Sequence, residues 1–228
     1  MKITYLGHSA FILESSVSLL FDPFLRDNPI ASLGPDDVVP DYILVSHGHS
    51  DHLGDAIYIA KKTKAPIITV NELSIYCSNK GVTSHAMHIG GKHEFSEHFA
   101  VKLTPALHGS AVDSDNMIYT GLACGFIVEL DGKTIYFAGD TGLTYDMKAV
   151  IGDLNDIDVA LLPIGDNFTM GPEDAVVAAK WLGAKTVIPM HYNTYPLIQQ
   201  DASSFVSEVE AKTSAKGVIL APGESWQL

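Results

Sequence analysis

Four side chains able to bind a metal ion fall within six consecutive positions, directly after the apolar run Tyr42–Ser46. They are His47, His49, Asp51 and His52. Imidazoles crowded into one loop repel one another when protonated and lose hydration when buried, and both effects cost stability. A divalent cation removes this conflict because it binds neutral imidazole and carboxylate. The spacing therefore predicts a metal site rather than an ordinary loop.

The expected backbone of this segment distributes its side chains between two ions. In an extended loop, His47 and His49 point the same way because alternate residues do. Asp51 and His52 are then free to face a second ion. Gly48 lets the backbone pass close to the metal, since it has no side chain.

Further ligands are expected just past other strands. A closed structural site would fill all four positions of a tetrahedral ion with protein ligands close at hand. Here single metal-capable residues follow three distant predicted strands. Each would lie in the same layer of strand ends as the first motif. They are His108 after Val101–Pro105, Asp140 after Thr134–Ala138, and His191 after Thr186–Met190. Each alone would be an ordinary loop residue, but as a set with the first motif they indicate one metal centre.

The elements that must position these residues occur twice. Helical periodicity is clear in Asp55–Lys62, Asp174–Leu182 and Asp201–Ala211. Short strand-like runs surround them, and Asp131–Gly132 is typical of a tight hairpin turn. The order hairpin, strand, helix, strand runs from Phe11 to Val70 and again from Phe126 to Met190, with Asp22 and Asp140 in equivalent places.

Such a repeat predicts an internal duplication. Each β-β-α-β half buries one face of its sheet on its own helix and needs the other half for the second face. We therefore expect an α/β fold, a four-layer αββα sandwich. No Pro/Ser-rich linker divides the chain, so residues 1–228 are expected to form a single domain.

Composition narrows the class of protein. The chain has 228 residues, of which 46% are hydrophobic, so disorder is excluded. Its 14 basic and 27 acidic residues give a net charge of −13, which argues against nucleic-acid binding. No run approaches the roughly 20 apolar residues of a membrane helix. Met1–Leu6 has the pattern of a strand rather than a signal peptide. Cys77 and Cys124 make no disulfide framework, so a cytoplasmic location is expected.

The ligand pattern resembles that of the metallo-β-lactamase superfamily of binuclear hydrolases. Leu6-Gly7-His8-Ser9, Phe21-Asp22-Pro23-Phe24 and Met190-His191-Tyr192 also resemble a narrower bacterial and archaeal family of metal-dependent hydrolases, similar to L-ascorbate-6-phosphate lactonase. The resemblance implies a metallo-β-lactamase fold with two metal ions. It implies that His47, His49 and His108 bind the first metal and Asp51, His52 and His191 the second. Asp140 would bridge them.

This arrangement implies hydrolysis of a small ester, lactone or phosphoester. Two cations about 3.5–4 Å apart lower the pKa of a bridging water toward about 7, so no Ser or Cys nucleophile is needed. Zn²⁺ is the first choice of ion, with Mn²⁺ or Fe²⁺ as alternatives. Asp51 is expected to steer the proton of the nucleophile. His8 is either a catalytic neighbour of the metals or a structural histidine, and Asp22 is expected to orient a ligand imidazole. The roles of His85 and His88 stay open.

Other classes of function fit less well. A mononuclear iron oxidoreductase of the sulfur dioxygenase type is the alternative, weakened by the complete second ligand set. A flavodiiron protein typically carries Glu where His49 stands, and a non-catalytic metal protein would be expected to lack Asp51 or Asp140. A nuclease is disfavoured because the interval from His108 to Asp140 carries Asp113, Asp115, Glu129 and Asp131 against Lys133. The expected partner is a small-molecule substrate, with no nucleic acid and no membrane, and whether the chain forms a homo-oligomer is left open.

Overall fold

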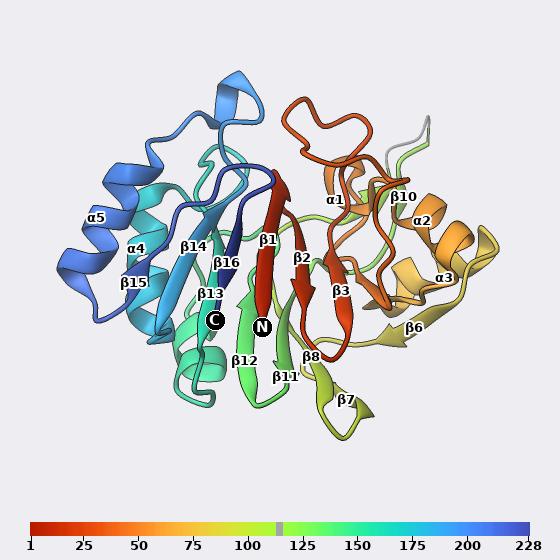
Figure 1. The fold of residues 1–228 in the computed structure, drawn as a ribbon, viewed down its shortest axis with the longest axis horizontal. Coiled ribbons are helices and arrows are strands. Elements are labelled where there is room, and N and C mark those ends of the chain that lie inside the picture. The colour runs from red at the N-terminus through yellow and green to blue at the C-terminus, as the bar shows by residue number, and fades with distance from the viewer. Residues whose placement is uncertain (113–115) are drawn as a thin grey trace. The chain divides into compact units, whose positions relative to one another are not determined.

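The computed structural model describes residues 1–112 and 116–228 (Figure 1). The chain divides into two compact units. Unit 1 comprises Met1–Gly91, Gly109–Ala123 and Leu220–Leu228; unit 2 comprises Lys92–His108 and Cys124–Ile219. Asp113 and Asp115, used in the charge comparison above, lie outside the described residues. That residues 1–228 act as a single domain stays a prediction.

Unit 1 is built on a seven-stranded mixed sheet. Its strands are, in spatial order, β16 (Ser225–Gln227), β1 (Lys2–Gly7), β2 (Ala10–Glu14), β3 (Ser18–Phe21), β4 (Tyr42–Leu44), β5 (Ile67–Val70) and β6 (Ser84–Met87). The helices are α1 (Ser50–Leu53), α2 (Ala56–Thr63) and α3 (Asn71–Asn79). A separate small ribbon pairs β9 (Ala111–Val112) with β10 (Ile118–Tyr119). The first and last strands, β1 and β16, lie side by side and antiparallel (Figure 1).

Unit 2 contains a second seven-stranded sheet. Its order is β15 (Lys216–Gly217), β14 (Thr186–Met190), β13 (Val159–Pro163), β12 (Lys133–Phe137), β11 (Cys124–Leu130), β8 (Phe99–Pro105) and β7 (Lys92–Ser96). Helices α4 (Pro172–Leu182) and α5 (Ala202–Lys212) pack against each other beside this sheet (Figure 1). A π-helix (Met147–Gly152) and a 3₁₀ turn (Pro196–Ile198) complete the unit.

The two sheets have the same topology, which confirms the prediction of two similar halves. The hairpin β2–β3 is followed by parallel β4 and β5, as the hairpin β11–β12 is followed by parallel β13 and β14. The likeness extends beyond the repeat detected in the sequence. In both units an antiparallel strand flanks the hairpin (β1 and β8), and a further helix leads to a last parallel strand (β6 and β15).

Local signals placed most of the elements correctly. Helix α4 begins with Pro172 in its first turn and ends at Gly183, whose φ of 62° suits glycine. Asp131 and Gly132 both have positive φ, as the predicted hairpin turn requires. Helix α3 was not predicted, because its buried face mixes Leu73 with Ser74 and Cys77 and gives no apolar stripe. Among the described residues, no helix is long and apolar enough to cross a membrane.

Candidate metal centre

In unit 1, side chains with metal-binding chemistry gather at one edge of the sheet. Strands β1, β3 and β4 run in the same direction because β2 is antiparallel to both β1 and β3, and β4 is parallel to β3. The residues just past their carboxyl ends are His8, Asp22 and the segment that begins at Ser46. His8 and Asp22 have φ values of 59° and 37°. Non-glycine residues avoid this region unless the surrounding structure holds them there, and such strain concentrates at functional sites.

Asp22 lies at the centre of a buried hydrogen-bond network. Its Oδ1 accepts from Ser46 N at 2.7 Å, and its Oδ2 accepts from Ser46 Oγ at 2.6 Å. The same Oδ2 lies 2.7 Å from His52 Nδ1, and Ser46 Oγ lies 2.9 Å from His47 Nδ1. Asp22, Ser46, His47 and His52 have no measurable exposure to solvent. One carboxylate therefore orients His52 directly and His47 through a serine, which is the role expected for Asp22.

The donor and acceptor roles in this network fix the tautomers of the two histidines. A carboxylate only accepts, so His52 must donate its Nδ1–H. Ser46 has a single hydroxyl proton and gives it to Asp22, so it can only accept from His47 Nδ1–H. In the neutral ring, both His47 and His52 are then left with the lone pair on Nε2. That is the atom a metal ligand needs, and the second nitrogen is already held in place.

The first two predicted ligands of the motif face each other. His47 Nε2 lies 2.9 Å from His49 Nδ1. Two nitrogens about 2.0–2.1 Å from one tetrahedral zinc ion would be roughly 3.3 Å apart, so this pair needs little adjustment to share an ion. The predicted common direction of His47 and His49 is confirmed. The backbone beyond them is not extended, because Ser50–Leu53 forms the short helix α1.

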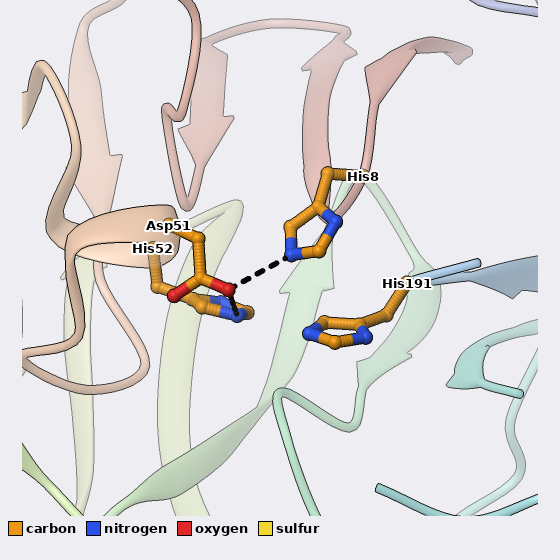
Figure 2. Close-up of side chains that lie close together, drawn as sticks. All are labelled: His8, Asp51, His52 and His191. Atoms are coloured by element: carbon orange, nitrogen blue, oxygen red, sulfur yellow. Dashed lines mark hydrogen bonds and ion pairs between the residues drawn. The ribbon is translucent and has the colours of Figure 1, made fainter. Parts of the chain in front are cut away.

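Asp51 and His52, on the helical turn α1, lie close to His8 (Figure 2). Asp51 Oδ2 is 3.2 Å from His8 Nε2 and 4.0 Å from His52 Nε2. His8 is fully buried, and the ring of Phe24 packs edge-on against it with centroids 5.7 Å apart. The histidine predicted as a neighbour of the site therefore contacts the carboxylate predicted to steer the nucleophile.

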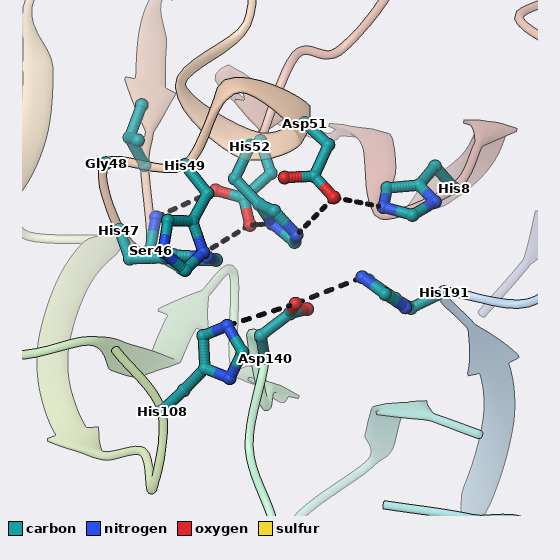
Figure 3. A network of polar contacts seen from close by, with 12 residues as sticks. His8, Ser46, His47, Gly48, His49, Asp51, His52, His108, Asp140 and His191 are labelled. Atoms are coloured by element: carbon teal, nitrogen blue, oxygen red, sulfur yellow. Dashed lines mark hydrogen bonds and ion pairs between the residues drawn. The ribbon is translucent and has the colours of Figure 1, made fainter. Parts of the chain in front are cut away.

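Unit 2 brings together the three ligands predicted at its strand ends (Figure 3). Asp140 Oδ2 lies 3.0 Å from His191 Nε2 and 3.7 Å from His108 Nε2. Asp140 and His191 are buried, and His108 keeps 15% of its side-chain surface exposed. His191 has a φ of 54°, another non-glycine residue in the left-handed region. A carboxylate oxygen between two imidazole nitrogens is what a bridging ligand would present.

The donor set suits divalent metal ions. Each unit presents imidazole nitrogens and a carboxylate, the ligands that zinc and related ions take from proteins. Of the remaining histidines, His85 lies in β6, and His88 lines a cavity of about 270 Å³ with Glu72 and Tyr119. Ser46 was not anticipated as part of the site. A serine between a strand and a histidine motif gives no spacing signal, and only the fold brings it against Asp22.

The fold and the donor residues place the chain in a known structural class. It superposes on the structure of Igni18, a metallo hydrolase from the archaeon Ignicoccus hospitalis, with a TM-score of 0.90 and 37% identity over 100% of this chain and 98% of the other. The expected fold class, the α/β metallo-β-lactamase fold, is confirmed.

Sequence comparison defines the family. A model described as Beta-lactamase superfamily domain matches residues 17–192. The chain is 55% identical to a protein of Pelotomaculum thermopropionicum over 100% of both chains, and 59% identical to one of Desulforamulus reducens over 98% of both. Both relatives are named UPF0173 metal-dependent hydrolase. The chain therefore belongs to this family within the β-lactamase superfamily.

Proposed function

We propose that this protein is a binuclear metal hydrolase acting on a small ester, lactone or phosphoester. As the resemblance of the sequence implies, His47, His49 and His108 would hold one divalent ion and Asp51, His52 and His191 the other, with Asp140 as a ligand common to both. The observation that carries the proposal is the buried network at Asp22, which leaves Nε2 of His47 and His52 as lone-pair donors. The names of the relatives support hydrolysis rather than the mononuclear iron oxidoreductase.

The chain's own residues supply the acid–base part of the reaction. Divalent ions held by these residues would supply a water whose pKa is lowered toward about 7 and would polarise the substrate oxygen. His8 donates its Nε2–H to Asp51 Oδ2 and so holds that carboxylate in one orientation. Asp51, held in this way, would steer the proton of the nucleophile. His8 is a positioning residue in this scheme.

The substrate is expected to be a small molecule. The net charge of −13 disfavours extended anionic partners, whereas divalent ions at the site would still attract one phosphate or carboxylate group. Zn²⁺ is the first choice of ion and Mn²⁺ or Fe²⁺ the alternatives. A cytoplasmic location is part of the proposal and rests on the sequence, whose two widely separated cysteines make no disulfide framework.

Metal content and hydrolysis test this proposal together. Protein purified without chelator or nickel should contain about two equivalents of Zn or Mn per chain by inductively coupled plasma mass spectrometry. It should then hydrolyse at least one member of a panel of esters, lactones and phosphodiesters. His108→Ala or Asp140→Ala should abolish this activity with unchanged circular dichroism. His98→Ala, at an exposed histidine of unit 2, is the matched control.

Two results would overturn the assignment. Wild-type activity in His108→Ala or Asp140→Ala would remove these residues from the site. About one equivalent of iron, with oxygen uptake on thiol substrates and no hydrolysis, would replace the hydrolase by the oxygenase.

A further inference from the structure

Two buried hydroxyl groups hold the glycine that separates His47 from His49. Gly48 N donates to Ser110 Oγ at 3.1 Å, and Ser110 Oγ lies 2.8 Å from Thr120 Oγ1. Thr120 N also donates to the backbone oxygen of Ser110 at 3.1 Å, so two hydrogen bonds join these residues. Ser110 is 5% exposed and Thr120 1% exposed, so water does not compete for these hydrogen bonds.

The same residues pack against Gly48 so closely that no side chain fits there. A methyl group built at position 48 would collide with Thr120 Oγ1 and lie 3.1 Å from the carbonyl carbon of Ala111. On the neighbouring side, a methyl group at Gly109 would lie 3.9 Å from Cε1 of His49. The glycine is therefore required at position 48 for the close approach of Ser110–Thr120, in addition to any approach of the backbone to a metal.

Fixing one amide of this loop fixes the direction of two ligands. The peptide unit that ends in Gly48 N is planar, so a hydrogen bond to its N–H sets the rotation of the backbone on the His47 side. On the His49 side, Gly48 would otherwise have the widest conformational freedom of any residue. The backbone rotations on both sides are restricted, because the N–H of Gly48 is hydrogen-bonded and the space beside the residue is filled. The separation of 2.9 Å between His47 Nε2 and His49 Nδ1 is the geometry that this restriction would preserve.

We propose that Ser110 and Thr120 are positioning residues for the His47–His49 pair. They act through Gly48 and touch neither imidazole nor substrate. This inference rests on the proposed function, because it takes the two histidines to be metal ligands. A purely structural role explains the hydroxyls poorly. The ribbon of β9 and β10 is two residues long on each side, and apolar side chains would anchor it at a lower desolvation cost.

The test uses variants that remove one hydroxyl at a time. Ser110→Ala and Thr120→Val each delete an oxygen with little change in shape, and Thr120→Ser restores the hydroxyl. Ser74→Ala is the matched control, since it removes a buried hydroxyl of unit 1 that contacts Ser84 instead of the loop. Zn²⁺ affinity is measured by competition with a chromophoric chelator. Hydrogen–deuterium exchange of the peptide containing Gly48 is measured on the metal-free protein.

We expect Ser110→Ala and Thr120→Val to bind Zn²⁺ about 10- to 100-fold more weakly than wild type, the usual effect of losing an outer hydrogen-bond partner. Exchange at Gly48 should be faster in Ser110→Ala. Thr120→Ser should bind like wild type, and Ser74→Ala should change neither readout. Gly48→Ala should also bind weakly, and combining it with Thr120→Ala should cost less than the two changes added, because part of the collision is relieved.

The outcomes separate this inference from the proposed function. If wild type binds Zn²⁺ and both hydroxyl variants bind it equally well, the positioning role is wrong while the hydrolase proposal stands. Unchanged exchange at Gly48 in Ser110→Ala would also overturn the positioning role. If wild type itself binds no divalent ion, the proposed function fails, and the positioning role falls with it.

Discussion

Replacing Asp22 by asparagine should reverse the hydrogen bonds that prepare two ligands for metal. The carboxylate accepts from Ser46 N, Ser46 Oγ and His52 Nδ1. The backbone N–H of Ser46 cannot change its role, so the asparagine oxygen must face it. The amide NH₂ then faces Ser46 Oγ and His52 Nδ1 and donates to both. Ser46 must pass its own proton on to His47.

The consequence is a change of tautomer in both histidines. His47 and His52 would now accept at Nδ1 and carry their proton on Nε2, the atom that must bind metal. Restoring the lone pair on Nε2 would break two neutral hydrogen bonds, each worth about 1 kcal/mol net. With some loss of alignment the cost is about 2–3 kcal/mol, or roughly 30- to 150-fold in the dissociation constant of the metal.

The stability of the metal-free protein should change much less than its affinity for metal. All three hydrogen bonds are kept, two of them with reversed polarity, and the loss of charge assistance is partly offset because a buried charge is removed. We expect a loss of about 1–2 kcal/mol in the free energy of unfolding. Zn²⁺ competition, urea unfolding and ¹⁵N NMR of the imidazoles measure the three effects. Asp55→Asn is the control, because Asp55 also accepts N–H groups, from Leu25 and Arg26. Wild-type Zn²⁺ affinity in Asp22→Asn, or a proton still on Nδ1 of His52, would refute the reasoning.

Two further predictions concern unit 2 and the buried thiol of unit 1. Burial alone would raise the pKa of the Asp158 carboxyl, but the N–H of Thr134 and the ammonium of Lys185 outweigh it and hold that pKa below its usual value. This stabilisation is present above the unfolded pKa and is lost as the pH falls through the lower folded pKa. Asp158→Asn should therefore cost about 1–2 kcal/mol at pH 7, with the difference from wild type vanishing in acid. Asp156→Asn, at an 85% exposed partner of the same lysine, should change little in the same pH series of urea unfolding curves. A pH-independent difference would contradict this cause. Burial raises the pKa of the Cys77 thiol to about 12, so the native protein should resist thiol reagents at pH 8 and react only when unfolded. Rapid modification of the native protein at Cys77, followed by mass spectrometry, would show that the thiol is accessible.

Local sequence patterns predicted those helices and strands whose characteristic residues lie close together in the chain. Apolar periodicity and end signals gave helices α2, α4 and α5 to within two residues at each end. The short strand β16 was missed, because its pairing with Lys2–Thr4 joins the two ends of the chain. Helix α1 was missed for a different reason. Four residues give too short a periodicity to distinguish a helical turn from an extended loop.

The sequence by itself determined which residues have metal chemistry and on which strand ends they lie. Residue type sets the ligand chemistry, and spacing relative to apolar runs sets the strand end, so neither depends on distant parts of the chain. It also determined the repeat, because hairpin, strand and helix signals recur in the same order. The tertiary structure alone decided which groups hold those ligands. Asp22 meets Ser46 across 24 residues, and Gly48 meets Ser110 across 62. The first contact arises where the carboxyl ends of the parallel strands β3 and β4 converge, and the second where the residue before β9 reaches Gly48. A hydroxyl or a glycine carries no local pattern that identifies its distant partner.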